Sequence, residues 1–216
     1  MNIITKQTGL NLLSLFIILN TKTMGSPTKK QKTGNPNASV ELYKTLAELQ
    51  QFKKLADQIE LGNITYIKKW LETNPDIGNM TNFDEQTLAH IATEKIQFDI
   101  LKLLLENGAN PNQQDSNDNS PLNVIFSEIW DNDEPNNKKI EILDLLISHG
   151  ADIDIQNNKG NSELHESAFY GIPEQIHFLL TKKANPNLTN KLGQKPIDLA
   201  TNPMIITMLR DAMQQQ

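Results

Sequence analysis

Three similar stretches decide the fold of this chain: LLLENGAN at residues 103–110, LLISHGAD at 145–152 and FLLTKKAN at 178–185. Each joins the end of an apolar helical pattern to a helix stop, an alanine and an Asn or Asp that starts a turn. Self-similarity at a fixed period is typical of repeat architectures, in which supersecondary units stack on one another. The chain is therefore expected to be a stack of repeated units.

A second marker precedes each stretch and has the same register. It is TLAH at residues 87–90, SPLN at 120–123, SELH at 162–165 and KPID at 195–198. Its copies begin 33, 42 and 33 residues apart, and the stops at positions 108, 150 and 183 repeat the last two of these intervals. The unit is thus 33 residues long, and one copy carries a nine-residue insertion between Pro121 and Gly150.

The first residues of this marker suit the start of a helix. Thr87, Ser120 and Ser162 can accept hydrogen bonds from the free N–H groups of a first turn. Pro121 and Pro196 stand at the first helical position, where a missing N–H group costs nothing. The first helix of each unit is expected to begin here.

The second helix of each unit is expected to end at the stop. Gly108 and Gly150 adopt the left-handed conformation cheaply, whereas Lys183 in that place costs about 1 kcal/mol. Apolar residues at helical spacing precede the stops, namely Ile100, Leu101, Leu104 and Leu105, then Ile142, Leu143, Leu145 and Leu146. Polar turn-forming stretches follow. One unit is therefore a helix, a short turn, a second helix and a projecting loop.

A weaker unit lies upstream of these repeats. Its apolar residues keep helical spacing through residues 55–71, Asn63 would cap its second helix, and a preceding helix starts near Ser39. The expected organisation is an apolar and basic extension at 1–38, a helix with a degenerate first repeat at 39–81, repeats at 82–114, 115–156 (with the insertion) and 157–189, and a degenerate C-terminal capping repeat at 190–216.

These motifs make the chain similar to ankyrin-repeat proteins, which repeat at about 33 residues with a Thr-Pro-Leu-His-x-Ala signature. The match runs from about Phe52 to Arg210, and no copy is perfect: position 88 is Leu instead of Pro, and position 123 is Asn instead of His. The resemblance implies an all-α solenoid of stacked helix-turn-helix units with projecting loops or hairpins. It also implies a concave face, built from the first helices and the loop tips, that binds other proteins.

Charge is distributed unevenly along the chain. The net charge is −6, but residues 1–38 carry five lysines and no acid, which leaves −11 for the rest. Because an acidic repeat domain binds phosphates poorly, nucleic acid is not expected as a ligand. The absence of cysteine excludes disulfides, thiolate-bound zinc and cysteine nucleophiles.

The N-terminal extension leaves two interpretations open. Its apolar run at 10–19 is too short to span a bilayer but suits the core of a signal peptide. No small-x-small cleavage pair follows, and translation from Met24 would make residues 1–23 a non-structural extension. The expected location is therefore either the cytoplasm or the outside of the cell.

Histidines are the only candidates for catalytic or metal-binding residues in the sequence. His90 and His165 occupy the same place in the repeat, which favours structural hydrogen bonds to neighbouring loops. A zinc-protease helix would need a second His four residues after His165, and position 169 is Phe. The sequence offers no metal site, no cofactor motif and no catalytic residues.

The leading hypothesis is a non-catalytic protein-binding scaffold, expected to be a monomer, whose partner is another protein. The alternative is an exported or membrane-associated factor that residues 1–38 direct to its place. The candidate contacts are polar residues at the loop tips and one aromatic residue in the insertion: Gln114, Asp115, Asn117, Asp118, Trp130, Gln156, Asn158, Lys159, Asn190 and Lys191.

Overall fold

The computed structural model describes residues 36–74, 79–129 and 137–215. The chain divides into two units, Met1–Thr45 and Leu46–Gln216. The described part of the first unit is the beginning of helix α3 (Pro36–Glu60). The second unit contains the rest of α3 and all the repeats, and everything below concerns this unit.

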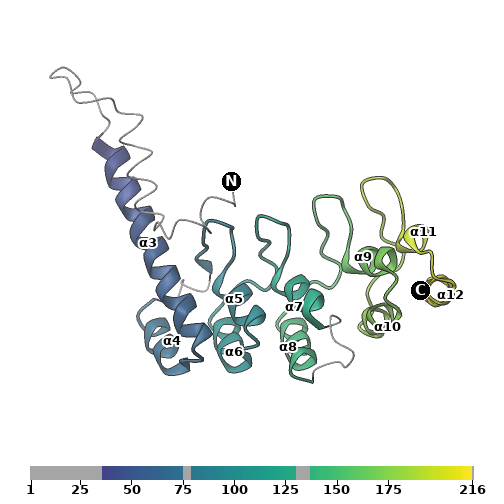
Figure 1. Cartoon of the computed structure of the whole chain (residues 1–216), viewed down its shortest axis with the longest axis horizontal. Coiled ribbons are helices and arrows are strands. Elements are labelled where there is room, and N and C mark those ends of the chain that lie inside the picture. Colours follow the sequence, from purple (N-terminus) through teal and green to yellow (C-terminus); the bar gives the residue numbers. More distant parts are fainter. Residues whose placement is uncertain (1–35, 75–78, 130–136, 216) are drawn as a thin grey trace, which may run out of the picture. The chain divides into compact units, whose positions relative to one another are not determined.

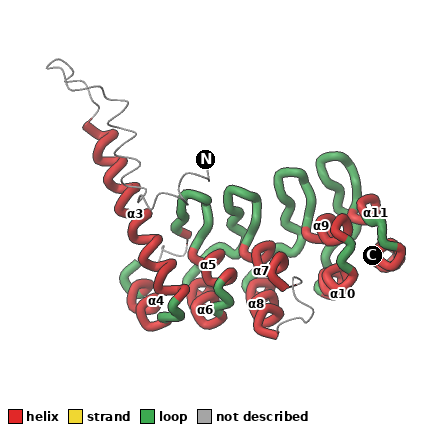
Figure 2. Tube along the Cα trace, in the orientation of Figure 1, coloured by secondary structure: helices red, strands yellow, loops and turns green. Residues whose placement is uncertain are grey.

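Helices in the second unit come in pairs, and Figure 1 shows the loops that connect successive pairs projecting to the same side of the stack. After α4 (Ile64–Leu71), the pairs are α5 (Leu88–Glu94) with α6 (Phe98–Glu106), α7 (Pro121–Ile129) with α8 (Asn137–Ser148), α9 (Glu163–Tyr170) with α10 (Pro173–Thr181), and α11 (Pro196–Leu199) with α12 (Pro203–Gln214). The described residues form no strand and only one isolated bridge, between Thr81 and Thr87, so loops and helices alternate throughout this part (Figure 2). This is the expected all-α stack of helix-turn-helix units.

Packing between neighbouring pairs builds one continuous core. Helix α5 packs against α7, α6 lies between α4 and α8, and α9 and α10 pack against α11 and α12. The apolar stripes predicted from the sequence are buried on α6 and α8, with Leu101, Leu104, Leu143 and Leu146 fully inaccessible to solvent. Each unit therefore buries its apolar face only by stacking on its neighbours.

Helix ends lie where the sequence places them. Helices α7 and α11 begin at Pro121 and Pro196, and the side chain of Asn63 accepts a hydrogen bond from the N–H of Tyr66 at the start of α4. Lys183 has a φ of 66°, in the left-handed region occupied by Gly108 and Gly150 at the corresponding stops. The predicted strain at this lysine is therefore present.

The insertion lies within the α7–α8 pair. Helix α7 has 9 residues against 7 in α5, and α8 has 12 against 9 in α6. Between the described helices α7 and α8 stand seven residues, 130–136, against three, 95–97, between α5 and α6. These differences of two, three and four residues account for all nine. Trp130 lies outside the described residues.

Candidate functional site

The most regular feature of the repeats is a five-residue loop tip that occurs four times, at residues 82–86, 115–119, 157–161 and 190–194. In each tip the side-chain oxygen of the first residue accepts hydrogen bonds from the backbone N–H groups two and four residues later, at 2.9–3.0 Å. The N–H of the fourth residue donates to the carbonyl of the first at 2.8–3.1 Å. The first residues are Asn82, Asp115, Asn157 and Asn190. All four tips therefore share one hydrogen-bonded frame.

The fourth residue of each tip is in the left-handed conformation. It is glycine in the last two tips, with φ near 75° at Gly160 and Gly193, but Glu85 (φ 59°) and Asp118 (φ 62°) in the first two. A non-glycine residue there costs about 1 kcal/mol. The first two tips thus carry an acidic side chain at a position where glycine would be easier to accommodate.

Hydrogen bonds join each tip to the next. The N–H of Ser116 donates to the carbonyl of Asp84 at 2.9 Å, and the N–H of Lys191 donates to the carbonyl of Lys159 at 3.0 Å. Between the second and third loops, the Gln114 side chain donates to the carbonyl of Gln156 at 3.1 Å. The four tips form one connected surface, which we call the loop row.

The histidines fix the loop row to the helices. Nδ1 of His90 accepts a hydrogen bond from the N–H of Thr87 at 3.0 Å, so Nε2 carries the hydrogen and donates to the carbonyl of Asn119, 2.9 Å away. His165 makes the same contacts with Ser162 and with the carbonyl of Gln194. The structural role predicted for both histidines is confirmed.

Burial also determines the protonation state of these histidines. The loss of hydration lowers the pKa of His90 and of His165, and the hydrogen bonds to the loop carbonyls only partly oppose this. Both rings are therefore neutral in the folded protein near pH 7. Neither ring has a nitrogen free to act as a base or to bind a metal ion.

The predicted contact residues fall into three groups in the structure. Those whose side chains are exposed are Asn117, Asn158, Lys159 and Lys191, and Asp118 is partly buried. Asp115 and Asn190 are buried, 6% and 8% exposed, because each is the first residue of a tip and holds its frame together. The side chains of Gln114 and of Gln156, which is also exposed, donate to loop carbonyls and so connect neighbouring loops. The tenth candidate, Trp130, lies outside the described residues.

Exposed apolar side chains were missed in the sequence. Phe83 is 62% exposed in the first tip, and Leu192 is 82% exposed in the last. At the end of α9, Phe169 and Tyr170 are also exposed, and their rings form an edge-to-face pair with centroids 5.2 Å apart. The sequence does contain a signal that Phe169 and Tyr170 are exposed, because the corresponding positions of the second repeat, 94 and 95, hold the charged residues Glu and Lys.

A small polar hollow lies beside the loop row, between the second and third loops. It has a volume of about 50 Å³ and is lined only by polar residues: Asp118, Asn119, Asn123, Asn157, Asn161, Ser162, Glu163 and Glu166. Small-molecule sites are about 300 Å³ or larger, so this hollow has room for water but not for a substrate. His165 does not line it.

Glu163 is the most perturbed group of this hollow. It stands at the first position of α9, where α7 and α11 have proline, and accepts a hydrogen bond from Nδ2 of Asn123 at 2.9 Å. Burial raises the pKa of Glu163 to about 7, the hydrogen bond from Asn123 opposes this rise, and the charge of Glu166 adds to it. Glu166 accepts hydrogen bonds from the amides of Asn157 and Asn161 and so connects α9 to the third loop.

Residues 36–74, 79–129 and 137–215 contain no group of three or more His, Asp or Glu side chains that could hold a metal ion. No helix within the same ranges is long and apolar enough to cross a bilayer.

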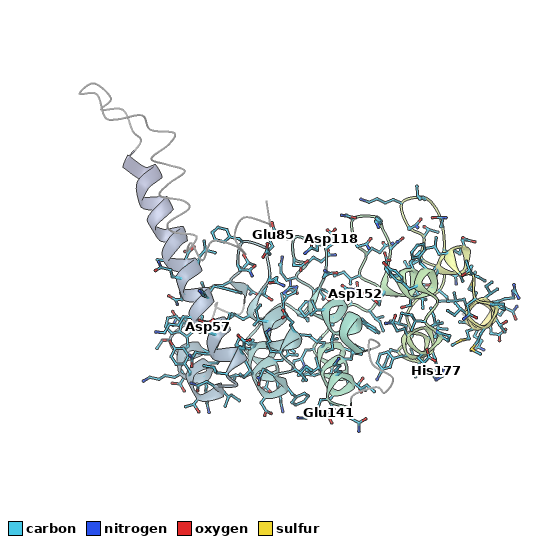
Figure 3. The ribbon with its side chains drawn as sticks, in the orientation of Figure 1. Asp57, Glu85, Asp118, Glu141, Asp152 and His177 are labelled. Atoms are coloured by element: carbon cyan, nitrogen blue, oxygen red, sulfur yellow. The ribbon has the colours of Figure 1, made fainter. Side chains whose placement is uncertain are left out.

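This architecture defines a class of protein: a helical repeat stack whose polar loops form one connected surface on a side of their own. Figure 3 shows Glu85 and Asp118 on the loop side, and Glu141 and His177 on the opposite side. The repeats are ankyrin repeats, since the ankyrin-repeat family model matches residues 84–116 and 117–158. The chain therefore contains ankyrin repeats, and repeats of this family form protein–protein interaction domains.

Three proteins illustrate the similarity of this chain to known sequences. Human inversin is 27% identical over 150 residues, which are 68% of this chain and 13% of inversin. Human transient receptor potential cation channel subfamily A member 1 is 32% identical over 115 residues, 53% of this chain and 10% of the channel subunit. The serine/threonine-protein kinase VIK of Arabidopsis thaliana is 28% identical over 119 residues, 55% of this chain and 25% of the kinase. The chain thus matches only a small part of each relative.

Proposed function

We propose that this protein is a non-catalytic scaffold that binds another protein through its loop row. The observation that carries the proposal is that four tips with one shared frame present different exposed side chains. Because hydrogen bonds already fix the backbone of each tip, a partner would not have to order the loops when it binds. Binding energy could then come from the few side chains that face solvent.

Exposed aromatic and apolar residues supply the strongest candidate contacts. Aromatic side chains often dominate the energy of an interface, and Phe83, Phe169 and Tyr170 are all at least 60% exposed. Of the residues predicted from the sequence, Asn117, Asn158, Lys159 and Lys191 remain candidates. Asp115 and Asn190 would affect binding only by disturbing the frame.

The test compares two variants of the full chain as baits for the same cell extract. The first replaces exposed tip residues whose side chains make no contact in the frame: Phe83→Ser, Lys159→Ala and Leu192→Ser. The control replaces two exposed residues of α4, Lys68→Ala and Lys69→Ala. We expect the first variant to lose about tenfold or more of a protein that the wild type and the control both retain. Circular dichroism would show that both variants are folded.

Unchanged capture by the loop-row variant would contradict this assignment. In that case the surface should be sought on α9, with Phe169→Ser and Tyr170→Ser as the next variant. If no protein is captured reproducibly by wild type and control, the scaffold function itself is wrong in that extract.

The alternative function places targeting in residues 1–38, which the structure describes only from residue 36 onwards. It is favoured by the apolar run at 10–19 and by the five lysines of this segment. Mass spectrometry of the N-terminus of the mature protein tests it. Cleavage between about residues 20 and 30 would support export, whereas a start at Met24 would remove this alternative.

A further inference from the structure

Charge is segregated along the loop row. Exposed Asp84 and Glu85 in the first tip, with Asp118 in the second, are acidic, whereas exposed Lys159 and Lys191 in the third and fourth tips are basic. The salt bridges within the described part of the chain involve none of these five side chains. The row therefore presents a negative half and a positive half to solvent.

An exposed apolar side chain marks each end of the row. Phe83, 62% exposed, lies next to the acidic residues of the first tip, and Leu192, 82% exposed, lies next to Lys191 in the fourth. If two such rows faced each other in antiparallel orientation, positive charge would lie opposite negative charge and Leu192 would lie opposite Phe83. In the same orientation, the second tip of one row would lie opposite the third tip of the other.

We propose that the loop row binds a second copy of this chain, with the two rows antiparallel about a two-fold axis. The first tip then faces the fourth tip of the other copy, so that Glu85 lies opposite Lys191. The second faces the third, which places Asp118 opposite Lys159. A two-fold interface uses the same surface on both copies, so each of these contacts occurs twice. A parallel arrangement is disfavoured because it would oppose like charges.

The strength of this association follows from the kind of contact. Exposed ion pairs each contribute little and are screened by salt, so the pairing would be weak and sensitive to ionic strength. At low concentration the chain would remain the monomer expected from its sequence. Because a second copy would cover the surface proposed to bind a partner, the two events would be mutually exclusive. Self-association requires no partner protein, and neither does its measurement.

Sedimentation velocity of the full chain over a range of concentrations tests the pairing, in buffer containing about 20 mM and about 500 mM salt. Self-association is expected at low salt and should weaken at high salt. Reversing one charge, with Glu85→Lys or Lys191→Glu, changes two attractive pairs into repulsive ones and should raise the dissociation constant about tenfold.

Two double variants of equal net charge distinguish the antiparallel register from general electrostatics. Glu85→Lys with Lys191→Glu exchanges the charges of one opposed pair and should restore association. Glu85→Lys with Lys159→Glu has the same net charge, but it places like charges opposite each other at both contacts and should not restore it. Equal behaviour of the two double variants would overturn the proposal, as would a wild type that stays monomeric up to about 1 mM at low salt.

A cross-link gives a second, independent measurement. Because the chain has no cysteine, single cysteines at the two ends of the row report contacts without background. A mixture of Phe83→Cys and Leu192→Cys chains should form a disulfide-linked dimer faster than either variant alone. Faster cross-linking of Phe83→Cys with itself would show a parallel arrangement and contradict the proposal.

Discussion

The substitution Glu163→Gln should stabilise this protein, by an amount that depends on pH. The carboxylate of Glu163 lies between α9 and the preceding repeat, where burial raises its pKa from 4.5 to about 7. A glutamine has nearly the same shape, and its carbonyl oxygen can still accept the hydrogen bond from Asn123. The substitution therefore removes the cost of burying a charge and leaves the contact in place.

The size and the sign of the effect follow from linkage between folding and proton binding. Between pH 4.5 and about 7 the unfolded chain releases the proton of this glutamate while the folded chain keeps it, so the wild type loses stability as the pH rises through this range. The full shift corresponds to about 3 kcal/mol. Because Glu163 is only partly buried, we expect about 1–3 kcal/mol after screening by solvent.

Urea unfolding followed by circular dichroism, repeated from pH 4.5 to 9, measures this difference. Glu163→Gln and wild type should be equally stable near pH 4.5, and the variant should be the more stable above pH 7. The control is Glu174→Gln, in the exposed first turn of α10, which should change stability by less than about 0.5 kcal/mol at every pH. A difference between Glu163→Gln and wild type that does not vary with pH would refute the reasoning.

Three further predictions test the backbone and one of the two buried histidines. Gly160→Ala should cost about 3 kcal/mol or more of unfolding free energy, because the new Cβ would lie 2.7 Å from the backbone nitrogen of Lys191. Gly193→Ala, at nearly the same φ but with open space around it, should cost about 1 kcal/mol. Equal losses of stability in the two variants would contradict this account. Lys183→Gly should raise the thermal unfolding midpoint through a gain of about 1 kcal/mol, since its φ is 66°, and a lower midpoint would show that the lysine side chain contributes more than its strain costs. His90→Asn should reduce the stability that the protein loses between pH 7 and pH 5. Burial holds the pKa of His90 below 6.5 in the folded chain, so below that pH the unfolded chain binds the proton more readily and the fold is destabilised. Chemical denaturation at both pH values measures this loss, and an equal loss in variant and wild type would contradict the prediction.

The fold could be predicted from the sequence because its determinants are local. A proline at a first helical turn and a stop in the left-handed region each act within a few residues. Their recurrence at one period then implied stacking. Even the strained stop at Lys183 was predicted, since position 183 is one period after Gly150.

The candidate site could be predicted only in part because exposure is not a local property. Lys159 and Asn190 are both polar residues of a loop tip, yet the first faces solvent and the second is buried. Asn190 is buried because its amide also bonds to Asn161 in the preceding loop, 2.9 Å away. Such a contact depends on how two repeats stack. The amino-acid composition of a single loop therefore does not predict this contact.

Periodicity nevertheless separates the two kinds of loop residue once the frame is known. The first residues of the four tips lie 33, 42 and 33 residues apart, the same intervals as the helix markers, and all are Asn or Asp. A residue type that returns in register has its role set by the repeat, and that role is to hold the frame. Phe83, Leu192 and the pair Phe169–Tyr170 have no counterpart of the same type at their repeat positions and are exposed. The frame does not require these side chains, so they can differ between repeats without loss of the fold, and the function of this protein should depend on them more than on the repeated polar residues.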